Sequence, residues 1–194
     1  MDFKERVYSV LVVSSFKKFN EAFAHTLPEA NYFPVNIVTN VAAAKRALLE
    51  KNYDFVLINT PLTDDFGMRL AIDTSSNERT VVLLIVKADI YSEVHSKVVD
   101  YGVMTLAKPA SAQSVLQALQ WMAAIRERLR RLEKKALSVE EKMEEIRIIN
   151  RAKWILIENL NMTETDAHRY IEKQAMDRCV TRKAIAQGII NTYK

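Results

Sequence analysis

Five polar side chains stand directly at the ends of apolar runs in the first half of the chain. They are the hydroxyls of Ser14 and Ser15, the amide of Asn59 and the ammonium groups of Lys87 and Lys108. If the apolar runs are parallel strands, these side chains meet at the edge of the sheet where open α/β folds bind their ligands. None of the five carries the negative charge that a hard divalent cation needs. The sequence therefore predicts no metal site at this edge.

The remaining polar groups near this edge are interpreted as structural. Asp64 and Asp65 lie several residues into the loop after Asn59, and we expect them to be solvated rather than catalytic. We expect Lys108 to be a structural residue paired with Asn59, while Lys87 adds a second positive charge that repels Mg²⁺ further.

A second group of candidate residues lies in the C-terminal part of the chain, where positive charge accumulates. Residues 1–120 carry 12 Lys and Arg against 13 Asp and Glu, a net charge of −1, whereas residues 121–194 carry 16 against 11, a net charge of +5. A polyanionic partner is expected on the basic half. The predicted contact residues are Arg147, Arg151, Lys153, Arg169, Lys173, Arg178, Arg182 and Lys183.

The elements that position the first group are apolar runs separated by helical patterns. The runs cover residues 8–13, 35–39, 55–59, 81–86 and 103–107. Continuous apolar strands between helices indicate a parallel sheet that is covered on both faces. The sequence predicts an α/β fold, a flavodoxin-like domain with a five-stranded parallel sheet, over residues 1–120.

A long helix is predicted to follow this domain, because no Gly or Pro occurs between Ala110 and Ala186. Apolar residues repeat along it every seven positions, which is typical of a coiled coil and predicts a parallel homodimer. The predicted dimer interface consists of Met122, Ile125, Leu129, Leu132, Ala136, Val139, Met143 and Ile146. Asn150 continues this series, and it either fixes the register of the dimer or lies beyond the seam.

The chain ends with two short helices. Residues 159–162 interrupt the long helix, Thr163 with Asp166 forms a capping pattern, and Thr181 is placed to cap the last helix. With the end of the long helix they predict a small three-helix bundle. The predicted organisation is a domain at 1–120, a coiled-coil helix at 121–146 and a C-terminal domain at 147–194.

The strand-end series resembles the receiver domain of bacterial response regulators over about residues 6–120. Lys108, Pro109 and Gly67 match positions of that family, and the resemblance implies a cis bond before Pro109.

The family's reactive positions differ in this chain. Asn59 replaces the phosphoacceptor aspartate, Ser14 and Ser15 replace the acidic pair that holds Mg²⁺, and Lys87 replaces a hydroxyl residue. The resemblance therefore implies a degenerate receiver domain that is not regulated by aspartyl phosphorylation. Such a domain remains free to bind a regulatory partner protein.

Residues 147–192 resemble the ANTAR family of transcription antiterminators. The matching stretches are residues 151–156, 163–168, 174–176 and 183–190. Trp154 departs from the family's glycine, and Ile157 replaces a methionine. The resemblance implies an RNA-binding domain that holds leader-mRNA hairpins so that a terminator cannot form. The order of receiver, coiled coil and ANTAR domain also matches that family.

Two side chains of this region have alternative interpretations. Trp154 either stacks on an unpaired base or packs within the bundle, and packing is preferred. His168 is interpreted as a packed core residue rather than as a contact or a switch.

Other classes of function remain as alternatives. A DNA-binding regulator is one, because helix, turn and helix also describe a helix-turn-helix, and a protein-interaction module with a solvated basic tail is another. An enzyme is disfavoured, because no catalytic triad or Gly-rich phosphate loop occurs and the histidines are dispersed. We expect no cofactor. The lone Cys179 and the lack of a membrane-length apolar run favour a cytoplasmic protein.

Overall fold

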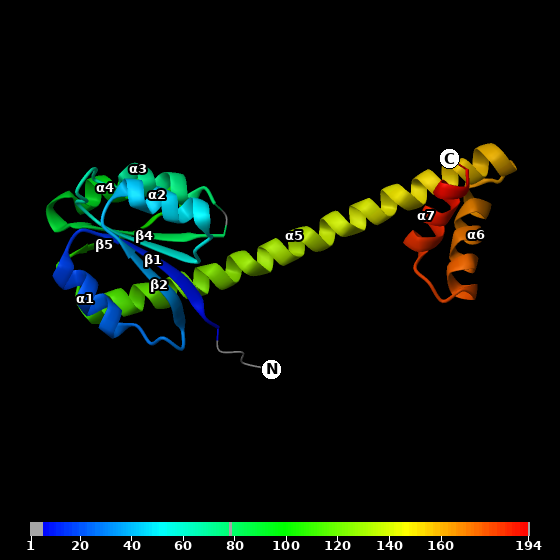
Figure 1. Cartoon of the computed structure of the whole chain (residues 1–194). Helices are drawn as coiled ribbons and strands as arrows, with labels where there is room; N and C mark the ends of the chain where they lie inside the picture. Colours follow the sequence, from blue (N-terminus) through cyan, green and yellow to red (C-terminus); the bar gives the residue numbers. More distant parts are fainter. Residues whose placement is uncertain (1–5, 78, 194) are drawn as a thin grey trace. The chain divides into compact units, whose positions relative to one another are not determined.

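The computed structural model describes residues 6–77 and 79–193, which divide into two compact units between Arg131 and Leu132. The strands are β1 (Tyr8–Ser14), β2 (Tyr32–Val38), β3 (Phe55–Asn59), β4 (Val81–Lys87) and β5 (Met104–Lys108). The helices are α1 (Lys17–Thr26), α2 (Val41–Glu50), α3 (Met68–Ser75), α4 (Tyr91–Val98), α5 (Ala112–Leu160), α6 (Glu164–Asp177) and α7 (Arg182–Thr192) (Figure 1). Short 3₁₀ helices at Ala88–Ile90 and Val99–Tyr101 flank α4.

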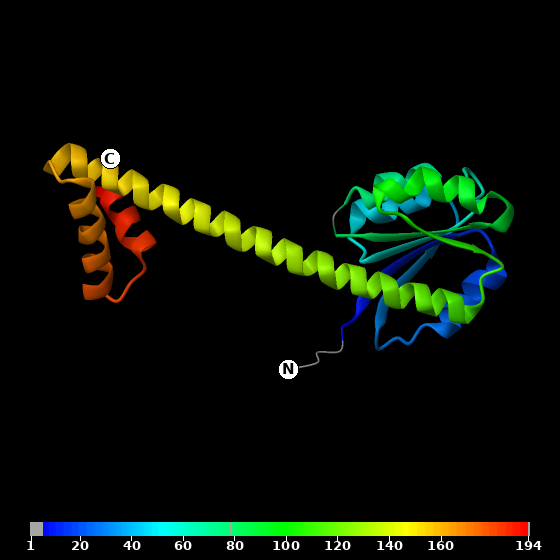
Figure 2. The ribbon, with the colours of Figure 1, turned by 180° about the vertical axis from the view of Figure 1, so that it is seen from behind.

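The first unit is a five-stranded parallel sheet in the order β2-β1-β3-β4-β5. Helices α2, α3 and α4 cover one face, and α1 with the beginning of α5 covers the other (Figures 1 and 2). Strand β1 shows how both faces are filled: Val10 and Val12 join the α1–α5 core, while Leu11 and Val13 join the opposite core. Because side chains alternate along a strand, a strand buried on both faces is apolar throughout. The predicted flavodoxin-like α/β fold is confirmed.

The predicted strands are all present, with shifted ends. β2 begins three residues before the predicted Val35, because the Tyr32 ring is buried beside Tyr8 and Phe55, with ring centroids 6.2 and 6.3 Å away. β1, β4 and β5 each end one residue later than predicted, so that Ser14, Lys87 and Lys108 are themselves the last residues of their strands.

The beginning of the predicted dimer seam packs inside the first unit, and this corrects the sequence-based interpretation. Met122 is fully buried in the core between the sheet and α5, and Leu129 packs against the same core. The physical reason is that a seven-residue apolar repeat suits a helix that lies on a sheet as well as a helix in a coiled coil. The coiled coil beyond Leu132 stays a prediction.

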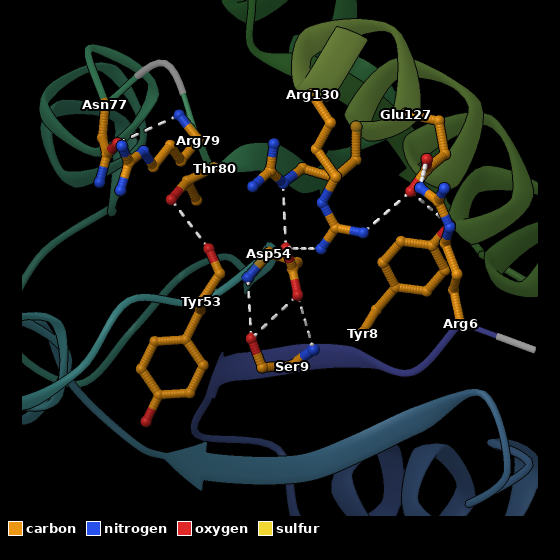
Figure 3. A network of polar contacts seen from close by, with 11 residues as sticks. Arg6, Tyr8, Ser9, Tyr53, Asp54, Asn77, Arg79, Thr80, Glu127 and Arg130 are labelled. Carbon is orange, nitrogen blue, oxygen red and sulfur yellow. Dashed lines mark hydrogen bonds and ion pairs between the residues drawn. The ribbon is translucent and has the colours of Figure 1, made fainter. Parts of the chain in front are cut away.

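A cluster of charges around Asp54 fixes this part of α5 to the sheet (Figure 3). The Asp54 carboxylate accepts hydrogen bonds from the Ser9 amide at 3.1 Å, from Arg126 Nε at 2.9 Å and from an Arg130 nitrogen at 2.7 Å. Burial alone would raise the pKa of Asp54, but the Ser9 hydrogen bond and the two guanidinium groups outweigh it and lower that pKa.

Glu127 extends this cluster to the beginning of β1. Its carboxylate accepts a hydrogen bond from Arg130 at 2.9 Å and from the Tyr8 hydroxyl at 3.3 Å, and it pairs with Arg6. The Arg130 guanidinium also lies 5.5 Å from the centre of the Tyr8 ring. The segment of α5 from Met122 to Arg130 is thereby held to the rest of the first unit by apolar packing and by ion pairs.

The second unit is a three-helix bundle formed by the end of α5 with α6 and α7. Its core contains Ile149, Ala152, Leu156, Ala167, Ile171, Ala175, Ile185, Ala186 and Ile190. The predicted caps are confirmed, because the Thr163 hydroxyl accepts from the Asp166 amide at 3.1 Å and that of Thr181 accepts from Ala184 at 3.2 Å. Within the described residues, no helix combines the length and apolar character needed to cross a membrane.

Candidate functional site

The strand-end site is buried and bonded within itself. Ser14, Asn59 and Thr60 are almost completely buried, and the Asn59 amide nitrogen donates a hydrogen bond to the Ser14 hydroxyl at 3.0 Å. The Asn59 amide oxygen has no hydrogen-bond partner among the described residues. The Ser15 hydroxyl donates to the Pro61 carbonyl at 3.3 Å and so ties the β1 end to the β3–α3 loop.

Lys108 does not pair with Asn59, contrary to our prediction. Its ammonium group donates a hydrogen bond to the carbonyl of Thr60 and lies 4.6 Å from the centre of the Phe16 ring. The sequence could not indicate this partner, because a backbone carbonyl belongs to every residue. The cis bond before Pro109 is confirmed.

The two lysines of the site lie close enough for their positive charges to repel each other. Lys87 and Lys108 end neighbouring strands in paired register. Burial, and then the charge of Lys87, lowers the pKa of Lys108. Within the described residues neither lysine forms an ion pair with a carboxylate.

The two loop acids support the backbone instead of being merely solvated. Asp64 accepts hydrogen bonds from the amides of Val41 at 2.9 Å and Ala42 at 3.2 Å, so it caps the first turn of α2 from another loop. These bonds lower the pKa of Asp64, the Val41 bond most strongly. Asp65 accepts from the Gly67 amide at 2.6 Å. The hydrogen bonds of Asp64 and Asp65 are thus made to backbone amides and not to the side chain of Asn59.

Gly67 closes the same loop in a conformation that only glycine adopts readily. Its φ is +93°, and a Cβ at this position would lie 2.9 Å from a methyl carbon of Ile58 and 3.2 Å from Leu62. The match of Gly67 to the receiver family therefore reflects the shape of the loop.

The predicted polyanion-binding residues fall into two groups in the second unit. Three form ion pairs: Arg147 with Glu144 at 3.7 Å, Lys153 with Glu164 at 2.8 Å and Arg182 with Glu172 at 3.5 Å. Five are exposed and have no ion pair among the described residues: Arg151, Arg169, Lys173, Arg178 and Lys183. The positive charges of these five side chains are therefore available to solvent or to an anionic ligand.

Lys153 differs from the other predicted residues, because it connects two helices of the bundle. Only 15% of its side chain is exposed, and its ammonium group lowers the pKa of Glu164 at the beginning of α6. This position is better explained by the α5–α6 contact than by a ligand.

Two interpretations of packing in the bundle are wrong. Trp154 is 65% exposed and does not belong to the bundle core. His168 is exposed as well, with its Nε2 atom 3.3 Å from a Glu172 oxygen. The core of α6 is supplied by Ala167, Ile171 and Ala175, so that His168 falls outside the buried stripe.

Comparison with known proteins assigns the C-terminal part of the chain to a domain family. Residues 138–190 match the model of the ANTAR domain. Over 140 residues the chain is 26% identical to the transcriptional regulatory protein PdtaR of two Mycobacterium tuberculosis strains. The matched region covers 72% of this chain and 68% of PdtaR.

Solved receiver structures share the fold of the first unit. The signal receiver domain of an HD domain-containing protein from Pseudomonas fluorescens Pf-5 has a TM-score of 0.56 at 18% identity, covering 69% of this chain and 96% of that one. The chemotaxis response regulator CheY4 of Vibrio cholerae has a TM-score of 0.53 at 18% identity, covering 60% and 98%. Residues 138–190 are therefore an ANTAR domain, and the unit that precedes them has the fold of a response-regulator receiver domain.

Proposed function

We propose that this regulator binds hairpins in leader mRNA as a homodimer and prevents a terminator from forming. The observation that carries this proposal is the set of five exposed basic side chains that form no ion pair with any described residue, all within the residues that match the ANTAR domain. Structured RNA is held through its phosphates by Arg and Lys, while its loops supply the bases that are read. We propose no enzymatic activity.

The basic side chains stand on surfaces that the bundle core leaves free. Arg169 and Lys173 are one helical turn apart on α6, on the side opposite Ile171 and Ala175. Lys183 lies in the first turn of α7, where backbone amides and the helix dipole also favour a phosphate. The two sites give an RNA backbone several cationic contacts on one small domain.

The dimer is supported by an unpartnered apolar stripe on α5. Leu132, Val139, Met143 and Ile146 are 50–57% exposed, and a shallow groove runs along the helix from Leu132 to Arg147. A seven-residue spacing places such residues against the same stripe of a second, parallel helix. In that arrangement Lys135 lies opposite Glu140 of the second copy, so the flanking charges attract one another.

The receiver domain is proposed to act without aspartyl phosphorylation. Its strand-end site offers an amide, two hydroxyls and two ammonium groups, and none of these is a phosphoacceptor carboxylate or an acidic Mg²⁺ ligand. Regulation then comes from a partner protein on this domain or from the RNA itself.

The test compares RNA and DNA binding for matched charge reversals. Arg169→Glu with Lys173→Glu should weaken binding of a leader hairpin by about tenfold or more, because two phosphate contacts are lost. Lys17→Glu with Lys18→Glu makes the same charge change on exposed α1 positions and should leave affinity nearly unchanged.

Fluorescence anisotropy with a hairpin and with a promoter duplex, at fixed salt, gives both affinities. Tighter binding to the duplex would identify a DNA-binding regulator. Equal losses in the two double variants would mean that only net charge matters, and the assignment of the interface to α6 would be wrong.

A further inference from the structure

Trp154 is an exposed indole that the bundle does not use. It lies on α5 between Ala152 and Leu156, both of which are buried in the bundle core. A two-residue step turns an α-helix by about 200°, so Trp154 points away from α6 and α7. Both views of the ribbon show α6 and α7 together on one side of the C-terminal part of α5 (Figures 1 and 2).

The direction of Trp154 coincides with that of the apolar stripe. Trp154 follows Ala136 by 18 residues, which is five turns of a straight α-helix at about 3.6 residues per turn. It follows Met143 by 11 residues, which is close to three turns. The indole therefore stands on the side of α5 that carries the groove between Leu132 and Arg147.

Trp154 determines how long the exposed apolar stripe of α5 is. With Met122 and Leu129 packed against the receiver core, the exposed stripe from Leu132 to Ile146 covers 15 residues, about two heptads. Extension to Trp154 gives 23 residues, slightly more than three heptads. Three to four heptads is the range in which a coiled coil becomes a convincing assignment.

We infer that Trp154 is a contact between two copies of this chain and closes the C-terminal end of their parallel seam. The inference rests on the proposed dimer and names a residue outside its heptad positions. In a parallel pair the two Trp154 side chains lie at the same height, where they bury a large aromatic surface against each other or against the facing helix. The bundles stay on the outer side of the pair, because Ala152 and Leu156 face away from the seam.

The charges beside the seam favour a second copy over an unrelated helix. Lys135 and Glu140 occupy opposite flanks of the groove, five residues apart, and a parallel copy brings each against the other. Arg147 is compensated by Glu144 of its own chain at 3.7 Å, which reduces its repulsion of Lys142 in the second copy. Asn150 then lies between Met143 and Trp154 at a position of the seven-residue repeat, where a polar residue fixes the register.

Intrinsic fluorescence isolates this residue, because the chain contains only two tryptophans. In full-length protein with Trp121→Phe, all tryptophan emission comes from Trp154. Raising the protein concentration should shift that emission to shorter wavelength and protect it from acrylamide, over the range in which sedimentation shows dimer formation. Emission that is unaffected by protein concentration but quenched by hairpin RNA would overturn the inference and make Trp154 an RNA contact.

Variants at the two tryptophans give a matched comparison by sedimentation. Trp154→Ala should raise the dimer dissociation constant by about tenfold or more, as truncation of a central aromatic contact does, and Trp154→Phe should restore most of the loss. Trp121→Ala, at an exposed position in the first unit, should have little effect. An unchanged dissociation constant for Trp154→Ala would overturn the inference.

Cross-linking tests the parallel register. In a Cys179→Ser background, Asn150→Cys should form an intermolecular disulfide on mild oxidation, whereas Glu141→Cys, on the outer side of the helix, should not. Cross-linking of both variants alike, or of neither, would contradict a parallel seam that reaches Trp154. The sedimentation and cross-linking readouts do not use RNA, so a Trp154-dependent dimer that binds no hairpin would refute the proposed function and leave this inference intact.

Discussion

In the receiver-type unit, Arg126, Arg130 and Lys108 each donate to an acceptor of the same chain. In the ANTAR unit, basic side chains such as Arg151 and Lys183 stand in solvent without an ion pair among the described residues. The first arrangement uses positive charge to hold elements together, and the second leaves it available to a ligand. The same residue types therefore predict opposite consequences of mutation: loss of stability in one unit and loss of binding in the other.

The largest expected effect on stability comes from removing Asp54. Asp54→Ala should lower the free energy of unfolding by about 3–5 kcal/mol, because Arg126 is buried and would lose a charged partner. Urea denaturation followed by circular dichroism measures it. Asp73→Ala is the control, because its 3.9 Å pair with Arg69 is exposed and should contribute less than about 0.5 kcal/mol. Similar losses in both variants would remove the distinction between internal and surface charge.

The same carboxylate should make stability depend on pH. The folded-state pKa of Asp54 lies below its ordinary value of 3.8, so its contribution is complete above that value and is lost as pH falls through the folded-state pKa. Denaturation at pH 7 and at pH 3 should show a larger loss for the wild type than for Asp54→Asn. An identical loss in the two proteins would mean that other carboxylates account for it.

A smaller effect on stability is expected when an aspartate replaces Asn59 and the other residues of the strand-end site are left unchanged. Asn59→Asp should give no stable phosphoryl adduct with Mg²⁺ and acetyl phosphate, because Ser14 and Ser15 cannot hold the metal. It should also lower stability by about 1–3 kcal/mol, since a buried carboxylate replaces an amide. Intact mass reads the first outcome and denaturation the second. An adduct on the wild-type receiver domain would disprove the loss of phosphorylation.

The smallest effect should follow from relieving the lysine pair. Lys87→Gln removes a positive charge that lowers the pKa of Lys108, so the folded state should gain less than about 1 kcal/mol at pH 7. The gain should shrink as the pH rises toward the ordinary pKa of lysine, because Lys108 then loses its charge. A loss of stability would show that Lys87 has a supporting contact.

The sequence predicted the sheet well because continuous apolar runs have few alternatives, and Phe55–Asn59 was located without error. It could not assign Met122 and Leu129, because the same repeat fits a receiver core and a dimer seam. It missed the Asp54 cluster, whose partners lie 45, 72 and 76 positions away along the chain. The predicted packing of Trp154 and His168 failed because hydrophobic or aromatic character does not tell which side of a helix faces the core.

Gly67 shows which part of a receiver-like loop is set by shape and not by chemistry. Its φ of +93° and the nearness of Ile58 exclude any side chain, whether or not a phosphoryl group is ever transferred beside it. In a saturation library selected only for folded protein, position 67 should accept almost no substitution, whereas the partly exposed Ser15 should accept many. A glycine that matches the receiver family can thus be required by the architecture of the loop alone, independently of any phosphoryl chemistry at the same edge of the sheet.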